Sequence, residues 1–321
     1  MRRILRAIRN VLSPKWQHRL HRHILVPAGY REMISRANRV AIVKVQGDFA
    51  GDQEVVLYDL RRVAHILEKG LLHPNWEPGH GGSIYRQLCA ELINAENLGC
   101  AGTEDQTYEW ACSLKRGYEQ AQQQNAFERS KPREQAVPLS ATEVEQFIRT
   151  RRSVRSFEER AVPAAIVKKI VDSINWSSTS CNRQPAVVYV AQTVKTAREC
   201  MRQFKGATGI SSYVPCFIVF CADMRGYTFP AERLLPAIDV ALGMQNVALM
   251  AHGYGLSLTM LSWAQHSPRE NTRLRALFDI PMYHEIIAGC LCGYPGIAVA
   301  PPARKSVEAT MRTLADEGTG N

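Results

Sequence analysis

The C-terminal part of the chain alternates short apolar segments with capped helical segments, and this alternation most strongly limits the fold. Four segments rich in β-branched and apolar residues are short enough to be strands, at residues 186–191, 216–222, 256–263 and 285–293. Apolar residues at helical spacing occur before and between them. The pattern therefore predicts helices alternating with strands from Ser140 onward.

Capping residues mark where the helices of this part begin. The predicted N-terminal caps are Ser140 with Glu143 three residues later, Pro163, and Ser267-Pro268 with Glu270. A long apolar segment, PAIDVALGMQNVALMAHGYG, is predicted to be one helix closed by Gly253 and Gly255. The helix that begins at Ser267 is expected to end near Phe278.

Residues 1–139 show helical patterns only. Apolar spacing predicts helices at residues 57–72, 83–99 and 107–124, and the polar run at 122–135 predicts an exposed linker. We therefore expect two domains. The first, residues 1–139, is a helical N-terminal extension with a linker, and the second is residues 140–321.

The first thirteen residues and the net charge bear on possible partners. Residues 1–13 have the spacing of a basic amphipathic helix, which either makes weak contact with an anionic membrane or docks on its own protein. The formal net charge of +10 favours an anionic partner such as phosphate, nucleic acid or a membrane surface. We expect no nucleic acid, because the basic residues lie on no recognised reading element and few aromatics are interleaved with them.

The nine cysteines indicate a reducing compartment and no metal site. They form no CxxC pair and no metal-ligand spacing with histidine, and several lie in apolar runs such as CFIVFC. No segment approaches the roughly 18 apolar residues of a membrane span, and the N-terminus lacks a secretory h-region. We expect a cytoplasmic protein, with peripheral membrane attachment as the alternative.

Three polar clusters indicate a bound ligand. They are Arg151-Arg152-Ser153-Val154-Arg155, the turn STSCNRQP at 178–185, and Pro301-Pro302-Ala303-Arg304-Lys305. Guanidinium groups suit forked contacts with phosphate oxygens, although solvated surface arginines are the alternative for each cluster taken alone. Asn182 carries an acceptor and a donor for an imide edge, and an arginine over the adjacent carbonyl would stabilise negative charge there after reduction. This combination fits a flavin better than an adenine.

These motifs together resemble the FMN-dependent nitroreductase family over about residues 140–314. The stretches that carry the resemblance are RRSVRSF, SSTSCNRQP, ALGMQNVALMAHGYGLS and GYPGIAVAPPARK, in this order and spacing. The resemblance implies an α+β, nitroreductase-like fold with a central, mainly antiparallel sheet wrapped by helices. It also implies FMN as cofactor, NAD(P)H as reductant, and a homodimer with FMN at the subunit interface.

The resemblance also assigns cofactor-binding roles by position. Contacts to the FMN phosphate and ribityl chain are assigned to Arg151, Arg152 and Ser153, and contact with the pyrimidine edge of the ring to Arg155. The turn that reads the ring is assigned to Ser180, Asn182 and Gln184, and the backbone amides near flavin N5 to Leu261 and Ser262. A C-terminal phosphate clamp is assigned to Arg304 and Lys305. No catalytic acid–base residue is implied, because flavin N5 carries the chemistry and Arg155 tunes it. Ala186 stands where the family often has Trp, so packing under the ring is expected to differ.

The N-terminal extension adds a further group of polar residues. His65, Glu68 and Lys69 share one predicted helix face, and His80 lies in a glycine-rich loop. The alternatives are groups that reach a substrate pocket and an exposed, salt-bridged helix turn. The sequence leaves open which is correct.

Three functions are compatible with these observations. The first is an FMN-dependent oxidoreductase that passes electrons from NAD(P)H through flavin N5 to a small organic acceptor such as a nitroaromatic or quinone. The second is a biosynthetic flavin dehydrogenase or oxidase whose N-terminal region is a lid or docking surface. The third is a non-catalytic peripheral membrane adaptor on a flavin fold. Neither the acceptor nor the choice between NADH and NADPH follows from the sequence, which has no G-x-G-x-x-G motif.

Overall fold

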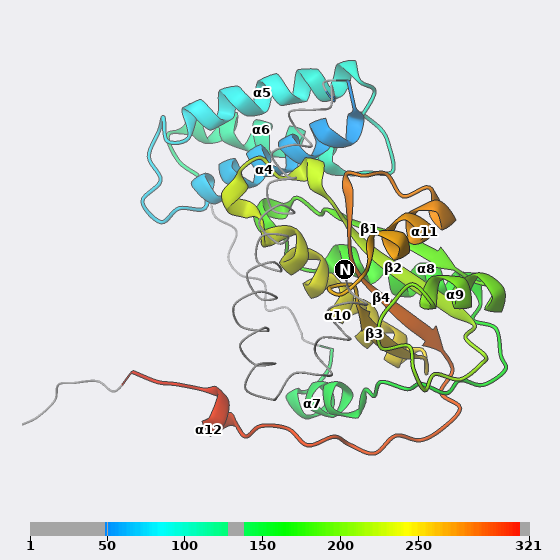
Figure 1. Cartoon of the computed structure of the whole chain (residues 1–321). Coiled ribbons are helices and arrows are strands. Elements are labelled where there is room, and N and C mark those ends of the chain that lie inside the picture. Colours follow the sequence, from blue (N-terminus) through cyan, green and yellow to red (C-terminus); the bar gives the residue numbers. More distant parts are fainter. Residues whose placement is uncertain (1–48, 50, 128–137, 315–321) are drawn as a thin grey trace, which may run out of the picture.

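A computed structural model describes residue 49 and residues 51–127 and 138–314. Within these ranges three helices form a layer beside a body that contains a sheet (Figure 1). The predicted basic helix at residues 1–13 and most of the predicted linker lie outside the described residues.

Four antiparallel strands form the sheet, in the order β1-β2-β4-β3. Their bounds are Ala186–Ala191 for β1, Cys216–Asp223 for β2, Ser257–Ser262 for β3 and His284–Gly293 for β4. Each strand matches its prediction to within one residue at either end. The central strands β2 and β4 are buried almost throughout, which explains their continuous apolar runs. The predicted α+β fold with a mainly antiparallel sheet is confirmed.

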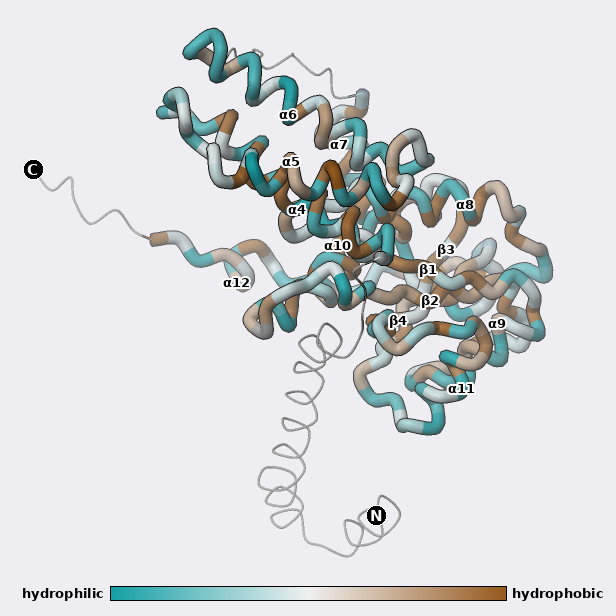
Figure 2. Tube along the Cα trace, turned by 90° about the horizontal axis from the view of Figure 1, so that it is seen from above, coloured by the Kyte–Doolittle hydropathy of each residue, from teal (hydrophilic) through white to brown (hydrophobic). Residues whose placement is uncertain are grey.

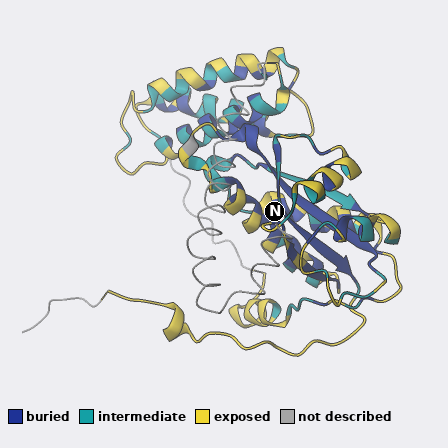
Figure 3. Cartoon of the chain, in the orientation of Figure 1, coloured by how far each residue is buried: buried dark blue, intermediate teal, exposed yellow. Residues whose placement is uncertain are grey.

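Helices cover both faces of the sheet. Their bounds are Ala164–Asp172 for α8, Val194–Met201 for α9, Leu235–Gly253 for α10 and Pro268–Phe278 for α11. Alternate residues of β2 face opposite ways: Ile218 and Phe220 share a core with α8 and α10, whereas Phe217 and Val219 share one with α9 and α11. Figures 2 and 3 show hydrophobic and buried residues concentrated along the strands.

The predicted boundaries of the helices are largely confirmed. Helix α7 (Ala141–Thr150) and helix α11 begin at the expected capping boxes, and α11 ends at Phe278. Helix α9, the short helix α12 (Val307–Thr310) and the 3-10 helices were not predicted. The 3-10 helices are η2 (Ser173–Trp176), η3 (Ser180–Asn182), η4 (Met224–Gly226) and η5 (Pro230–Glu232). These pieces are too short for an apolar period to reveal them.

The three predicted helices of the N-terminal extension are confirmed. They are α4 (Gln53–Leu71), α5 (Gly82–Asn97) and α6 (Thr107–Gln124), and they enclose an apolar core of their own. Helix α4 begins four residues earlier than predicted because the Asp52 side chain caps the N–H groups of Glu54 and Val55. The boundary between two domains at residue 139 remains a proposal.

No helix in the described ranges combines the length and the hydropathy that a membrane span requires.

Candidate functional site

The turn at residues 178–185 has a backbone conformation that is rare for its residue types. Cys181, Asn182 and Gln184 have φ values of 52°, 54° and 55°. The left-handed conformation costs a residue with a side chain on the order of 1 kcal/mol. Three such residues within four positions keep this conformation only where surrounding contacts impose it. The turn is therefore held from outside.

Asp239 holds the first half of this turn. The Ser180 N–H and hydroxyl donate to Asp239 Oδ1 at 3.0 and 2.9 Å, and the Tyr227 hydroxyl donates to Oδ2 at 2.8 Å. Burial and then the Asp239 carboxylate raise the pKa of Tyr227 far above its usual value, so Tyr227 stays a donor. A single buried carboxylate on α10 thus connects the turn to the core.

Arg183 turns its side chain into the protein. Its Nη2 donates to Glu232 Oε1 at 2.6 Å, and its guanidinium lies 5.3 Å from the centre of the Tyr227 ring. Burial raises the pKa of Glu232, but hydrogen bonds from the Phe229 and Thr228 N–H groups and the Arg183 charge outweigh it and lower that pKa overall. Arg183 is therefore a structural residue of the turn.

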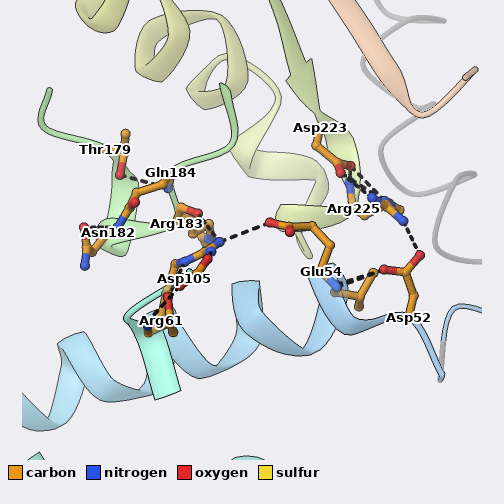
Figure 4. Close-up of polar contacts among 12 residues, drawn as sticks. Asp52, Glu54, Arg61, Asp105, Thr179, Asn182, Arg183, Gln184, Asp223 and Arg225 are labelled. Atoms are coloured by element: carbon orange, nitrogen blue, oxygen red, sulfur yellow. Dashed lines mark hydrogen bonds and ion pairs between the residues drawn. The ribbon is translucent and has the colours of Figure 1, made fainter. Parts of the chain in front are cut away.

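Helix α4 reaches the same turn from the other side (Figure 4). Arg61 is 4% exposed, and its Nη1 donates to the main-chain carbonyl of Arg183 at 3.3 Å. Its Nε donates to Thr107 Oγ1 at 2.9 Å, and its Nη2 forms an ion pair with Asp105. The N-terminal extension thus contacts the backbone of the predicted ring-reading turn directly.

A second ion-pair network joins α4 to the sheet (Figure 4). Arg225 pairs with Asp223 at the end of β2 and with Asp52 at the start of α4. Burial raises the pKa of Asp223, but hydrogen bonds from His284 and Arg225 lower it overall, so this carboxyl is ionised. This network docks the extension, and it meets the turn at the Asp223 N–H, which donates to the Pro185 carbonyl at 2.8 Å.

The predicted ring-reading side chains lie together and half-buried on the turn. Gln184 Nε2 donates to Asn182 Oδ1 at 3.1 Å, and the Gln184 N–H donates to Thr179 Oγ1 at 3.1 Å. The structure therefore groups Asn182 and Gln184 as predicted, while the Ser180 hydroxyl is engaged by Asp239.

The cluster at residues 151–155 runs beside strand β3. Ser257 Oγ donates to the Arg152 carbonyl at 2.8 Å, and Thr259 Oγ1 donates to the Val154 carbonyl at 2.6 Å. Arg151, Arg152 and Ser153 are half-buried and Arg155 is exposed. The segment is thus held as an extended chain at the edge of the sheet.

A pocket of about 280 Å³ opens next to this segment. Arg152, His252 and Ser257 are among its lining residues. Burial, then Arg151 and Arg152, lower the pKa of His252, so the local potential is positive. Such surroundings suit an anion.

The remaining predicted residues are in two other places. Leu261 is buried in the core beneath α9 and α11, so only its backbone could face a ligand, and Ser262 Oγ accepts a hydrogen bond from the Ala264 N–H. Arg304 and Lys305 are exposed and line a separate pocket of about 850 Å³ along α7.

A single chain does not bring the predicted site residues together. The turn leads into β1, whereas residues 151–155 lie beside β3. Strands β1 and β3 are the two outer strands of the described sheet. Three strand spacings, roughly 14 Å, separate them. The turn and residues 151–155 also lie at opposite ends of the sheet. Ala186 begins β1 beside the end of β2, where Asp223 pairs with His284 at the start of β4, whereas Ser257 pairs with Gly293 at the end of β4.

The polar residues of the extension form local contacts. His65 Nδ1 lies 3.6 Å from Glu68 Oε2 on α4, and the His80 ring stacks on that of His73 with centres 5.8 Å apart. Whether these residues or Lys69 reach a ligand stays untested. Among the described residues, no group of three or more His, Cys, Asp or Glu side chains is placed to hold a metal ion.

Sequence reasoning missed the residues that hold the turn. Arg61 lies on the same face of α4 as the buried residues Leu57 and Ala64, and Asp239 is the one carboxylate in the apolar α10. A charged residue on an otherwise apolar face is the signal that could have identified both.

Comparison with known proteins confirms the resemblance to the nitroreductase family. Residues 148–210 match the model of that family. A Methanothermobacter thermautotrophicus protein, provisionally named NADH dehydrogenase/NAD(P)H nitroreductase, is 26% identical over 162 residues, covering 49% of this chain and 80% of that protein. The NAD(P)H-dependent FMN reductase of Bacillus subtilis is 22% identical over 182 residues, covering 52% of this chain and 72% of that protein.

Among solved structures, NfrA1 of B. megaterium is 22% identical with a TM-score of 0.48. That match covers 54% of this chain and 75% of the other.

Proposed function

Because residues 148–210 match the nitroreductase family, we propose that this chain binds FMN and transfers electrons from NAD(P)H to a small organic acceptor such as a nitroaromatic or quinone. The B. subtilis relative is named as an NAD(P)H-dependent FMN reductase, which supports a flavin oxidoreductase. The observation on this chain that carries the proposal is the strained turn, which holds the carboxamides of Asn182 and Gln184 side by side.

The residues present fit FMN. Asn182 and Gln184 offer donors and acceptors for the imide edge of the ring, and the guanidinium groups of Arg151 and Arg152 suit its phosphate. Bound FMN would supply hydride-transfer chemistry at N5. Arg155 is exposed and free to balance negative charge beside the ring edge, and the scheme needs no acid–base residue.

We place the cofactor between two copies of the chain. The two groups of predicted ligands lie at opposite edges of the sheet, so one FMN would contact residues 151–155 of one copy and the turn of another. An exposed apolar surface supports this arrangement: Trp176 is 82% exposed, and Ile238 and Leu242 on α10 are each 48% exposed. Apolar surface of this kind is typical of a subunit interface.

The C-terminal segment supports the same arrangement. After residue 300 the chain runs along α7 and away from the sheet, and it is exposed from there to residue 314 (Figures 1 and 3). A segment with apolar side chains such as Met311 and Leu314 is expected to pack against a second copy. Arg304 and Lys305 would then clamp phosphate at the interface.

The visible spectrum of the purified protein tests the proposal. We expect a flavin spectrum that bleaches on anaerobic addition of NADH or NADPH, and the faster of the two identifies the reductant. A colourless protein that also fails to bind added FMN would contradict the proposal.

Replacement of Arg155 tests its assigned role. Arg155→Ala should slow reduction of bound flavin by about tenfold at full FMN occupancy, because a charge beside the ring edge is lost. Arg202 is an exposed arginine at the end of α9, so Arg202→Ala is the matched control. Its bound flavin should be reduced at the wild-type rate. Wild-type kinetics in Arg155→Ala would remove Arg155 from the site.

A biosynthetic flavin dehydrogenase or oxidase is the second candidate, and the contact between α4 and the turn favours it. In such an enzyme NAD(P)H would reduce the bound flavin slowly, and turnover with nitroaromatics and quinones would be poor. Stopped-flow reduction followed by a panel of acceptors distinguishes it from the first candidate.

A further inference from the structure

We propose that Arg61, in the N-terminal extension, is a positioning residue of the flavin site: it fixes the peptide unit between Arg183 and Gln184. The inference rests on the proposed function, because it gives the fixed turn its purpose. It assigns the extension a role as part of the cofactor site's framework rather than as a mobile lid.

The first argument is the burial of the Arg61 charge. The guanidinium lies on the face of α4 that buries Leu57 and Ala64, where an unpaired charge would be strongly unfavourable. Its donors are matched to four acceptors: Glu54, Asp105, Thr107 Oγ1 and the Arg183 carbonyl. A planar guanidinium with this many partners has a fixed orientation, so the bond to the turn is directional.

The second argument is the position of the accepting carbonyl. The Arg183 carbonyl belongs to the peptide unit that joins Arg183 to Gln184, and the orientation of that unit is set by ψ of Arg183 and φ of Gln184. Gln184 has φ of 55°, a conformation that its side chain disfavours. The hydrogen bond from the charged Arg61 guanidinium, at 3.3 Å, offsets part of the cost of one such residue.

The third argument is that Arg61 anchors a part of the turn that its other anchors do not touch. The Arg183 side chain pairs with Glu232, and the Pro185 carbonyl accepts the Asp223 N–H, but neither contact involves the carbonyl of Arg183. Asp239 holds Ser180 at its start, and Arg61 holds the carbonyl of Arg183 near its end. Of the predicted ring-reading residues, Asn182 lies between Ser180 and Arg183, and Gln184 directly follows Arg183. Loss of Arg61 should therefore loosen the carboxamides while Ser180 stays in place.

The structure offers matched controls on the same helix. Asp52→Asn weakens the ion pair with Arg225, which docks α4, and asparagine keeps the N-terminal cap. It leaves in place the main-chain bond from the Asp223 N–H to the Pro185 carbonyl, through which this network meets the turn. Arg62 is next in sequence and pairs with Asp59 on its own helix at 3.5 Å, so Arg62→Lys tests the change of residue type alone.

The experiment compares Arg61→Lys, Asp52→Asn and Arg62→Lys in the full chain. The FMN dissociation constant is measured by flavin fluorescence, and amide hydrogen exchange of residues 180–184 is measured without FMN. We expect Arg61→Lys to weaken FMN binding by about tenfold and to accelerate exchange in the turn by about tenfold, as for loss of one charged hydrogen bond. Both controls should stay within about twofold of wild type.

Two results would overturn the inference. One is wild-type affinity and exchange in Arg61→Lys. The other is an equal effect of Asp52→Asn, which would show that general docking of α4 matters and not this contact. Should the wild-type chain not bind FMN, the proposed function fails, while hydrogen exchange still decides whether Arg61 holds the turn.

Asp105→Asn provides a second variant if Arg61→Lys does not fold. Asp105 Oδ1 accepts the Thr107 N–H, which asparagine can still do, whereas Oδ2 pairs with Arg61. As for Arg61→Lys, we expect weaker FMN binding and faster amide hydrogen exchange in the turn. No change in either measurement would contradict the inference.

Discussion

Single charged residues placed among apolar neighbours shape the candidate site. Asp239 lies on the buried face of α10 and binds both Ser180 and Tyr227, and Arg61 lies on the buried face of α4 and binds the Arg183 carbonyl. Each is fully paired, which is the condition under which a buried charge is tolerated. The conformation of the turn therefore depends on residues that do not belong to it.

Removing the Asp239 carboxylate should destabilise the protein strongly. Asp239→Ala removes three hydrogen bonds and leaves the partly buried Ser180 N–H and the buried Tyr227 hydroxyl without this acceptor. We expect the free energy of unfolding to fall by about 3 kcal/mol in urea denaturation. Tyr227→Phe removes one of these bonds and should cost about 1 kcal/mol, so equal losses in both variants would contradict this account.

At the scale of elements, close packing and capping fix the helices around the sheet. Helix α10 passes so close to η2 that a Cβ on Gly243 would lie 2.4 Å from Ile174 Cγ1 and 3.0 Å from the Ile174 carbonyl. Helix α11 begins at a capping box in which the Glu270 carboxylate accepts from the Ser267 N–H and hydroxyl. These local features hold the elements that carry Asp239 and cover the sheet.

A methyl group at Gly243 should be destabilising although alanine favours helices. Gly243→Ala gains about 1 kcal/mol of helix propensity but must displace Ile174, so we expect a net loss of about 1–2 kcal/mol in the free energy of unfolding. Gly117→Ala in α6 has nothing within 4 Å of its added Cβ and should stabilise by about 0.5–1 kcal/mol. Thermal or urea unfolding compares the two, and a stabilised Gly243→Ala would refute the packing.

The Glu270 carboxylate gives α11 a pH-dependent contribution to stability. Burial raises the pKa of Glu270, but the Lys205 ion pair and the hydrogen bonds from Ser267 lower it overall to about 2, below the usual 4.5. The folded state therefore holds the proton more weakly than the unfolded state. The contribution is complete above pH 4.5 and is lost as the pH falls toward 2.

Glu270→Gln tests this pH dependence. At neutral pH the variant should be less stable than wild type by about 1 kcal/mol, and the difference should shrink between pH 4.5 and pH 2. Urea denaturation of both proteins across this window measures it. A difference that does not change with pH would show that the charge of Glu270 is unimportant.

At the scale of the whole molecule, one chain presents two separate groups of the predicted ligand residues and leaves an apolar surface exposed. Helix α10 is apolar on nearly all sides, a pattern usually seen in fully buried helices, yet Ile238 and Leu242 are exposed. A second copy packed on this face would cover both residues, and the turn and residues 151–155 of different chains could then share a ligand.

Replacement of Leu242 tests this assembly. We expect wild type to have twice the 36.0 kDa mass of one chain in light scattering, and Leu242→Glu to shift toward the single-chain mass and lose FMN. Leu277→Glu on α11, where Leu277 is 41% exposed on the other side of the sheet, should leave both unchanged. A single-chain mass for wild type with FMN bound would contradict the shared site.

The membrane alternative remains a prediction on residues outside the described ranges. Liposome flotation with and without residues 1–13 is its measurement. Loss of flotation on deletion would support the membrane contact, whereas no flotation of either protein would remove it.

Local signals in the sequence are sufficient to predict the strands, most helix boundaries and the family resemblance. These depend on local signals, such as the period of apolar residues in 216–222 and the cap at Ser140 with Glu143, which neighbouring residues fix without distant contacts. The residues that surround the turn at 178–185 become known only from the packing of distant elements. Arg61 and Asp239 are 122 and 56 positions from Arg183, and a contact across such separations depends on how helices pack, which no local pattern encodes.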